Sequence, residues 1–158
     1  MIRVGTGYDA HPLAEGRRLV LCGVEIPFRK GLAGWSDGDV AVHAVIDALL
    51  GAAALGDIGS RFPSGDARFK GISSLTLLSE TAELIRGHGW QVGNIDVTIV
   101  AQEPKLGPFI DEMRSRIAEA LSLGKEQVSV KTKSGNGLGF AGEGKGIEVY
   151  AVALIEER

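Results

Sequence analysis

Three side chains in the first third of the chain, Asp9, His11 and His43, could together hold a metal ion. Asp9 and His11 are two positions apart at the end of what reads as an edge strand, and alternate residues of a strand project from the same face. His43 lies at the front of a long apolar helical segment. Two imidazoles and one carboxylate are the ligand set of a catalytic zinc that keeps its fourth position free. The residue types and their spacing therefore predict an open metal site.

Each of these residues also has a simpler interpretation. A single histidine is more often a structural residue than a ligand, and an aspartate before a proline-bearing turn, here Pro12, is common turn chemistry. His88, between Gly87 and Gly89, is expected to be a helix-end residue and no ligand.

The surroundings of His43 leave two alternatives open. Asp39 and Asp47 each lie one helical turn away, and a ligating histidine usually donates its second N–H to a carboxylate or carbonyl. Either aspartate could accept that hydrogen bond. An N-cap role for the Asp37 and Asp39 region, and a surface or subunit-contact role for Asp47, agree equally well with the sequence.

Length and composition restrict the class of protein. A chain of 158 residues predicts a single domain spanning 1–158, large enough for one core. Its hydrophobic content of 44% and charged content of 23% are ordinary for a soluble globular protein. A formal net charge of −3 gives no electrostatic footprint for nucleic acid or an anionic membrane, so we expect neither as a partner.

Cysteine usage and hydropathy predict a cytoplasmic protein. The single cysteine, Cys22, cannot form an internal disulfide and is expected to be a small buried hydrophobe in a reducing compartment. The chain opens on a strand pattern rather than on a signal peptide. Its longest apolar stretch, 40–55, is interrupted by His43, Asp47 and Gly51 and is too short to span a bilayer.

The hydrophobic pattern predicts alternating strands and helices. Strands are expected at 3–9, 17–23, 24–28, 94–100, 127–131 and 146–154, with 17–28 forming a hairpin. Helices are expected at 37–55, from Ser73 or Ser74 to Gly87, and from the 104–108 turn to Leu121, with a loop over 56–71. The pattern favours an α+β sandwich, a mixed sheet with helices on one face.

The helix predicted at 37–55 is expected to have Ser36 or Asp37 as its N-cap. This segment is apolar nearly all round, which argues for burial on most faces. In so small a domain, we expect that burial to lie in a subunit contact.

Taken in order, several motifs resemble the 2-C-methyl-D-erythritol 2,4-cyclodiphosphate synthase family of the non-mevalonate isoprenoid pathway. The resemblance runs from residue 3 to about 155, and it rests on the order and spacing of eight motifs rather than on any single one. These motifs lie at 7–11, 36–43, 47–59, 62–63, 69–71, 94–102, 104–105 and 138–140.

The resemblance implies a homotrimer of ferredoxin-like α+β subunits with active sites between neighbours, and zinc held by Asp9, His11 and His43. It implies a phosphorus–oxygen lyase acting on 4-diphosphocytidyl-2-C-methyl-D-erythritol 2-phosphate. The 2-phosphate of this substrate attacks the β-phosphorus, CMP leaves and the cyclic diphosphate forms. Positioning and charge neutralisation dominate such phosphoryl transfers, which suits a site built around a metal.

The resemblance also implies the substrate contacts. The 57–59 turn and the 62–66 loop would hold the methylerythritol part, and 101–106 would form the cytidine pocket. Without the resemblance, 101–106 reads as a plain strand-to-helix turn in which Lys105 is a surface charge. The candidate substrate-binding residues are Asp9, Ala10, His11, Trp35, Ser36, Asp57, Ile58, Gly59, Phe62, Pro63, Ser64, Gly65, Asp66, Ala101, Gln102, Glu103, Pro104, Lys105, Leu106, Lys133, Ser134, Gly135, Asn136 and Phe140.

The chain departs from the family pattern at Trp35, where the family usually carries a histidine that contacts the phosphates. An indole can donate one hydrogen bond but cannot become cationic. Ser36 still offers a hydroxyl, and Ser134 keeps the hydroxyl expected near the phosphates. Trp35, Ser36 and Ser134 are therefore the candidate catalytic residues besides the metal ligands.

Asn136 is a second departure, since it stands where the family has a glutamate that binds a second metal, magnesium or manganese. An amide oxygen still suits a hard cation but binds it less strongly than a carboxylate. Lys133 adds a positive charge nearby that could neutralise phosphate directly.

The order of charges in 142–146 is also exchanged relative to the family, with Glu143 before Lys145. An ion-pair ring near the trimer axis could survive this exchange, but binding of an isoprenoid diphosphate there is in doubt. Drift on a solvated loop explains the exchange equally simply.

Three functions follow from these residues. The first is the cyclising synthase. The second is a catalytically weakened trimeric relative that binds a cytidine nucleotide or an isoprenoid diphosphate, which the identities of Trp35 and Asn136 keep open. The third is a generic zinc hydrolase, for which the sequence singles out no general base.

Overall fold

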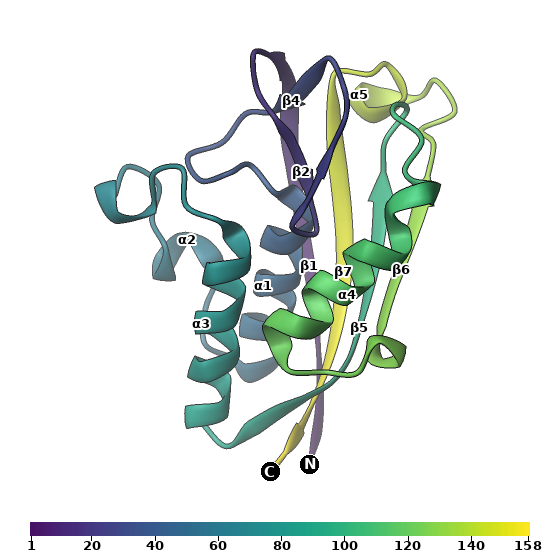
Figure 1. Cartoon of the computed structure of the whole chain (residues 1–158). Helices are drawn as coiled ribbons and strands as arrows, with labels where there is room; N and C mark the ends of the chain where they lie inside the picture. The colour runs from purple at the N-terminus through teal and green to yellow at the C-terminus, as the bar shows by residue number, and fades with distance from the viewer.

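A five-stranded mixed sheet forms the framework of the chain, and the computed structural model describes residues 1–158 (Figure 1). The strand order is β4-β1-β7-β5-β6, with β5 and β6 parallel and the other neighbours antiparallel. The strands are β1 (Ile2–Glu15), β4 (Lys30–Leu32), β5 (Trp90–Val100), β6 (Val128–Lys133) and β7 (Gly146–Glu157). A separate hairpin pairs β2 (Leu19–Leu21) with β3 (Val24–Ile26), as the sequence predicts.

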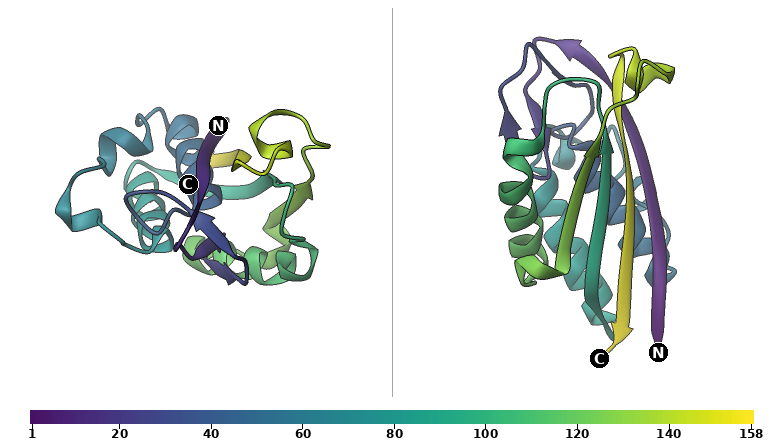
Figure 2. Two further views of the ribbon diagram at one scale, coloured as in Figure 1. Left: turned by 90° about the horizontal axis from the view of Figure 1, so that it is seen from above. Right: turned by 90° about the vertical axis from the view of Figure 1, so that its right-hand side faces the viewer.

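Three long helices cover one face of the sheet (Figure 2). They are α1 (Val40–Ala53), α3 (Ser74–Gly87) and α4 (Ile110–Leu121), and the two short helices are α2 (Ile58–Arg61) and α5 (Gly139–Gly142). Single 3-10 turns lie at η1 (Ala67–Phe69), η2 (Gly107–Phe109) and η3 (Lys125–Gln127). This arrangement confirms the prediction of an α+β sandwich. None of the helices has the length and hydropathy that a membrane span requires.

The finer, ferredoxin-like prediction differs from the observed topology. A ferredoxin-like chain runs β-α-β-β-α-β, whereas the main elements here run β1, α1 with α3, β5, α4, β6 and β7. The last strand inserts between β1 and β5 and pairs antiparallel with both. Hydrophobic periodicity identifies each strand but does not specify its neighbours, so the sequence could not reveal this order.

The first strand and the first helix approach each other unusually closely. Odd-numbered residues of β1 face the helices, and two of them, Gly5 and Gly7, have no side chain. A Cβ atom on Gly7 would overlap the carbonyl oxygen of Ala44, and one on Gly5 would overlap that of Ala48. Glycine at these two positions therefore lets the backbone of α1 rest directly on β1.

Helix α1 is the centre of the core. Every residue in it except Asp47 and Gly51 is buried. It packs on β1 and β7 on one side and on α3 on another, all within one chain. Burial inside the subunit therefore explains why α1 is apolar nearly all round. The prediction that this pattern reflects a subunit contact is wrong.

Helix α1 also begins later than the sequence predicts, at Val40 with Asp39 as the N-cap rather than Ser36 or Asp37. The Asp39 carboxylate accepts hydrogen bonds from the backbone N–H groups of Val42, Cys22 and Gly23. It therefore joins the helix to the β2–β3 hairpin. Cys22 in that hairpin is fully buried, as predicted.

Other element boundaries also differ from those that the sequence predicts. Strand β1 continues to Glu15, so Asp9 and His11 lie within the strand rather than at its end. Their outer edge is nevertheless unpaired, because β4 pairs only with 13–15. The 56–71 segment, predicted as a loop, contains α2 and η1. His88 follows α3 as its C-cap, which confirms the helix-end prediction.

Candidate metal centre and substrate cavity

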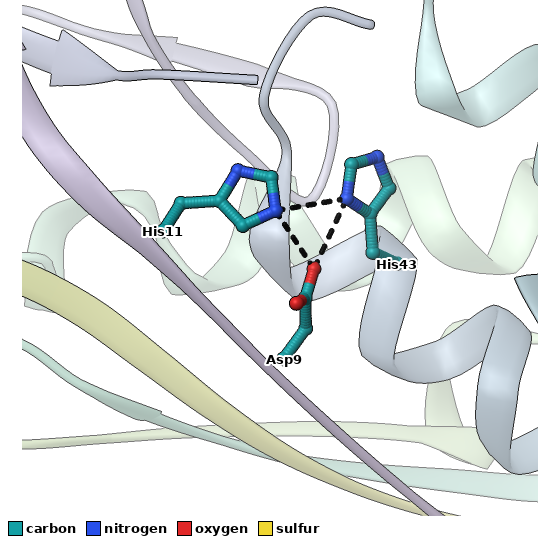
Figure 3. Close-up of side chains that lie close together, drawn as sticks. All are labelled: Asp9, His11 and His43. Atoms are coloured by element: carbon teal, nitrogen blue, oxygen red, sulfur yellow. Dashed lines mark hydrogen bonds and ion pairs between the residues drawn. The ribbon is translucent and has the colours of Figure 1, made fainter. Parts of the chain in front are cut away.

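Asp9, His11 and His43 meet at one point between β1 and α1 (Figure 3). The Asp9 Oδ2 atom lies 2.9 Å from His11 Nε2 and 3.2 Å from His43 Nδ1, and the two nitrogens are 3.4 Å apart. The close packing over Gly5 and Gly7 makes this possible, because it lowers the first turn of α1 onto the strand that carries the other two residues.

The three donor atoms have the spacing that a tetrahedral cation requires. Zinc bonds to nitrogen and oxygen are about 2.0 Å long, so tetrahedral ligand atoms lie about 3.3 Å from one another. The three observed separations lie within a few tenths of an ångström of that value. The donor set and its geometry therefore fit zinc, with the fourth direction open.

The Asp9 carboxylate at this centre keeps its negative charge. Partial burial raises the pKa of Asp9, but hydrogen bonds from His11 and His43 outweigh it and hold that pKa well below its usual range. Asp9 is therefore ionised over the whole physiological pH range. An ionised carboxylate with two imidazoles is a donor set ready for a divalent cation.

His43 makes its second contact with hydroxyl groups, and neither of the two aspartates considered from the sequence contacts its ring. Its Nε2 atom lies 2.9 Å from Ser74 Oγ and 3.0 Å from Ser36 Oγ. Asp39 caps α1, as one of the two interpretations had it, while Asp47 accepts a hydrogen bond from the backbone N–H of Ile58.

Trp35 lines the cavity beside the metal-binding residues and is 37% exposed. Its indole N–H donates to the backbone oxygen of Asp66 at 2.9 Å, and its own carbonyl accepts from the N–H of Gly71. The single hydrogen bond that an indole can donate is thus already used within the protein. Trp35 fastens the 62–71 loop in this structure, and a phosphate contact from its N–H would require that bond to break.

A cavity of about 390 Å³ opens beside the metal-binding residues. Ten of the predicted site residues line it, and they include all three metal-binding residues, Asp9, His11 and His43. The lining residues are Asp9, Ala10, His11, Pro12, Ala33, Gly34, Trp35, Ser36, His43, Ile58, Gly59, Phe62, Ser64, Phe69 and Leu77.

The loop at the cavity wall is held by its own side chains. Asp57 is the N-cap of α2 and forms a capping box with Ser60, and Asp66 caps η1. Phe62 and Phe69 pack edge to face with ring centroids 5.5 Å apart. Of the residues predicted in this loop, Asp57, Pro63, Gly65 and Asp66 lie outside the cavity lining.

The other predicted residues gather at a second place, the carboxyl ends of the parallel strands β5 and β6. The N–H of Ala101 donates to the carbonyl of Lys133, which puts the 101–106 and 133–136 segments side by side. Ser134 donates to the Oδ1 atom of Asn136, whose backbone is left-handed with φ of 52°. Lys133, Ser134 and Asn136 are all exposed.

A short helix, α5, closes over this second place. The Cα of Gly142 lies where a Cβ on Gly135 would point, so the two backbones are in direct contact. Phe140 on α5 is 41% exposed, and Glu143 and Lys145 just after it form an ion pair of 2.8 Å. The exchanged charges in this loop therefore pair with each other within one chain.

The two groups of predicted residues do not meet within one chain. Strands β7 and β5 separate β1 from β6 (Figure 1). Three strand spacings of about 4.8 Å put β1 and β6 roughly 14 Å apart. The 101–106 and 133–136 segments are absent from the cavity beside the triad.

Two polar residues at the metal centre were missed from the sequence. Ser74 is fully buried against His43, and Asp37 accepts a hydrogen bond from the Ser74 hydroxyl. The sequence predicts only a helix-capping role for each of them. Ser74 is separated from His43 by 31 residues, so no local pattern connects the two. The one available signal was that two consecutive serines begin α3, of which only Ser73 is the N-cap.

Fold and site together define a class: an α+β protein that presents two imidazoles and a carboxylate at the wall of an open cavity. Comparison with known proteins narrows this class. The chain belongs to the YgbB family, whose model matches residues 2–156.

The most similar relatives share one name. The 2-C-methyl-D-erythritol 2,4-cyclodiphosphate synthase of Syntrophomonas wolfei is 58% identical over 156 residues, covering 99% of each chain. The enzyme of the same name from Methylococcus capsulatus is 54% identical over 158 residues and covers all of both chains.

Solved structures agree with this assignment. A 2C-methyl-D-erythritol-2,4-cyclodiphosphate synthase in a CDP-bound form matches with a TM-score of 0.90 and 36% identity over 98% of this chain and 100% of that one. The bifunctional IspDF of Campylobacter jejuni matches with a TM-score of 0.96 and 40% identity. That match covers the whole of this chain and 43% of the bifunctional one.

Proposed function

We propose that this protein converts 4-diphosphocytidyl-2-C-methyl-D-erythritol 2-phosphate to 2-C-methyl-D-erythritol 2,4-cyclodiphosphate and CMP, as one catalytic domain over 1–158. The observation that carries the proposal is the convergence of Asp9, His11 and His43 on the wall of a cavity. The names of the full-length relatives support the same activity.

Asp9, His11 and His43 would hold zinc, with Asp9 Oδ2, His11 Nε2 and His43 Nδ1 as ligand atoms. Bound there, the ion would act as a Lewis acid toward a phosphate oxygen. The cavity wall at Ile58, Gly59 and Phe62 would position the methylerythritol part, so that its 2-phosphate lies in line with the β-phosphorus.

The cytidine would bind at the ends of β5 and β6. The CDP-bound structure of a similar synthase supports a cytidine nucleotide as ligand. The 101–106 turn supplies backbone groups for the base, and Lys133 and Ser134 supply a cation and a hydroxyl for the phosphates. Asn136 would be the protein ligand of a second cation, magnesium or manganese, offering a neutral oxygen.

A homotrimer with active sites between neighbours would bring these two places together. The observation that supports it is their separation within one chain, since a substrate with a cytidine at one end and a methylerythritol at the other needs both. The face of the sheet opposite the helices also exposes a row of large apolar side chains, as expected of an interface. They are Ile2, Val4, Tyr8, Tyr150 and Val152.

One assay tests the proposal against its alternatives. The purified protein is incubated with the diphosphocytidyl substrate, zinc and magnesium, and the products are separated. CMP together with the cyclic diphosphate supports the proposal, whereas CMP with a linear product indicates a hydrolase. If no CMP is released although a cytidine nucleotide binds, the protein is the catalytically weakened relative. Two features favour that alternative: the Trp35 N–H is already hydrogen-bonded to Asp66, and the Asn136 side chain is neutral.

A further inference from the structure

A short chain of hydrogen bonds runs from the metal centre into the protein. His43 Nε2 lies 2.9 Å from Ser74 Oγ, and Ser74 Oγ lies 2.5 Å from Asp37 Oδ1. Both the histidine and Ser74 are buried, and the cavity does not reach Asp37. The other ring nitrogen of His43, Nδ1, faces Asp9. The hydrogen bonds at Nε2 therefore influence which of the two ring nitrogens carries the proton.

The protons in this chain can be assigned from the donors and acceptors present. Asp37 receives the backbone N–H groups of Ser74 and Asp39 at 3.0 Å each, besides the Ser74 hydroxyl. With three donors directed at its two oxygens, its carboxylate serves only as an acceptor. The Ser74 proton is therefore committed to Asp37, and the Ser74 oxygen is left to accept.

An accepting Ser74 oxygen requires a donor on His43. If Nε2 of His43 were unprotonated, two lone pairs would face each other across 2.9 Å in a buried place, which is unfavourable. Ser36 Oγ, at 3.0 Å, is a second oxygen toward which the same N–H can point. Once a cation lies between Nδ1 and Asp9, the neutral ring therefore carries its proton on Nε2 and gives the Nδ1 lone pair to the metal. Without the cation, the ionised Asp9 carboxylate, 3.2 Å from Nδ1, competes for that proton.

We propose that Asp37 and Ser74 are positioning residues that fix His43 in the Nε2–H tautomer and orient its Nδ1 lone pair toward the metal. The inference rests on the proposed metal site for its purpose. Its geometry does not depend on turnover, and it gives roles to two residues outside the ligand set. Carboxylate partners of this kind hold the ring orientation of metal-bound histidines in other proteins, here through one intervening hydroxyl.

The same residues connect the metal ligand to the substrate loop. Asp37 also donates its own N–H to the carbonyl of Ile72, at the end of the 56–72 segment that walls the cavity. Ser74 is the first residue of α3. The position of His43 is thus fixed relative to the loop that would hold the substrate.

The tautomer can be read directly in the unaltered protein. Long-range proton–nitrogen NMR correlation distinguishes a protonated from an unprotonated ring nitrogen, and His43 is assigned by comparison with a His43→Gln sample. In zinc-loaded wild-type protein we expect His43 to have Nε2 protonated, with that proton exchanging slowly with water, and Nδ1 unprotonated. A neutral ring with the proton on Nδ1 overturns the proposal, whether or not the enzyme turns over substrate.

Substitutions then test the two positioning residues. Ser74→Ala and Asp37→Asn should weaken zinc binding about 10- to 100-fold in a chelator competition. Ser74→Ala should also shift the His43 Nε2–H proton signal upfield and speed its exchange with water, because the buried acceptor is lost. Ser74→Thr, which keeps the hydroxyl, should restore both readouts. The matched control is Ser73→Ala, because Ser73 is the neighbouring serine, exposed and without a side-chain hydrogen bond at the start of α3.

The outcomes are distinguishable from a failure of the proposed activity. If the wild type binds zinc but does not release CMP, the tautomer and affinity readouts still stand. If Ser74→Ala, folded by circular dichroism, binds zinc as tightly as Ser73→Ala and keeps the wild-type His43 Nε2–H signal, the positioning role is refuted.

Discussion

The two halves of the proposed site differ in how much of their structure one chain supplies. On the metal side, Asp9 and His11 are partly buried and His43 is buried, and each contacts the others or a buried serine. On the nucleotide side, Lys133, Ser134 and Asn136 are exposed, and the only side-chain hydrogen bonds among them are those between Ser134 and Asn136. The metal half is organised by the fold, whereas the nucleotide half lies open at an edge of the sheet.

Because of this difference, the two halves should contribute to binding in different ways. A site whose side chains are locked by packing loses little entropy on binding its ion. The exposed half must be ordered by the substrate or by a neighbouring subunit. Substitutions in the first half should therefore act on zinc content and stability, and those in the second on substrate or second-metal dependence and not on zinc content.

The largest effect is expected for His43→Ala. It removes a zinc ligand and leaves the rest of the fold in place, so the purified protein should lack stoichiometric zinc. Loss of metal-derived stabilisation of several kcal/mol corresponds to about a thousandfold or greater fall in kcat/KM. Elemental analysis and the CMP-release assay measure the two quantities. Asn136→Ala is the comparison from the other half and should keep its zinc; equal zinc loss in both variants would contradict the division.

Gly7→Ala should be the most destabilising small substitution. The added Cβ would overlap the carbonyl oxygen of Ala44, so α1 must move away from β1 and carry His43 away from Asp9. Overpacking of this kind costs about 3 kcal/mol or more where backbone must shift. Urea unfolding measures the cost, and zinc affinity should fall in parallel.

The control for this substitution is Gly87→Ala at the end of α3, where an added Cβ meets nothing within 4 Å. It should be neutral or slightly stabilising, since alanine favours helix. A Gly7→Ala protein as stable as Gly87→Ala would show that α1 does not depend on the close approach.

How much the sequence could predict follows the same division. The triad was found because strand alternation puts Asp9 and His11 on one face, a local rule. The elements were found from their periodicity, but the insertion of β7 between β1 and β5 depends on long-range pairing that no local pattern encodes. Gly7 is required because α1 packs over it, and the sequence does not predict that contact.

The partners of His43 show the limit of local reasoning most clearly. Asp39 and Asp47 are near it in sequence, yet Asp39 is turned toward the N–H groups of the helix start and Asp47 toward Ile58. The actual partner, Ser74, comes from a different helix. Proximity along a helix identifies candidates, but the competing demands of unpaired backbone N–H groups decide between them.

Stability should depend on pH through Asp39, the N-cap of the helix that carries His43. Burial, then the charge of Asp37, raises the pKa of Asp39 to about 6. In the unfolded chain the pKa of an aspartate is about 3.9. Between these two values the folded protein holds the proton more tightly, so the contribution of Asp39 to stability is full below pH about 4. It is lost as pH rises through about 6.

Asp39→Asn tests this, because an amide does not titrate. Urea unfolding with a chelator present should find the variant less stable than wild type by an amount that shrinks as pH rises from 4.5 to 7.5. The shrinkage is at most roughly 2 to 3 kcal/mol. A difference that stays constant over this range would show that the Asp39 pKa is not raised.

Asn136→Glu should sharpen the comparison from the nucleotide side. A carboxylate binds magnesium more strongly than an amide oxygen, so the magnesium concentration for half-maximal activity should fall. The left-handed backbone at this position will cost about 1 kcal/mol of stability with glutamate. Zinc content should not change. An unaltered magnesium dependence would indicate that Asn136 does not contact the second cation and that Lys133 neutralises the phosphates instead.

The smallest effect is expected for Trp35→Phe, which keeps an aromatic ring but removes the N–H that binds the Asp66 carbonyl. One such hydrogen bond contributes about 1 kcal/mol, so the 62–71 loop should open more readily and KM should rise about fivefold. Zinc affinity and kcat should stay close to wild type, because the indole N–H donates to the Asp66 carbonyl and not to a ligand atom. Limited proteolysis within 62–71 measures loop opening independently of turnover. A fall in kcat at unchanged KM would instead place the indole N–H on the reacting phosphates, and the hydrogen bond to Asp66 would then have to break during each catalytic cycle.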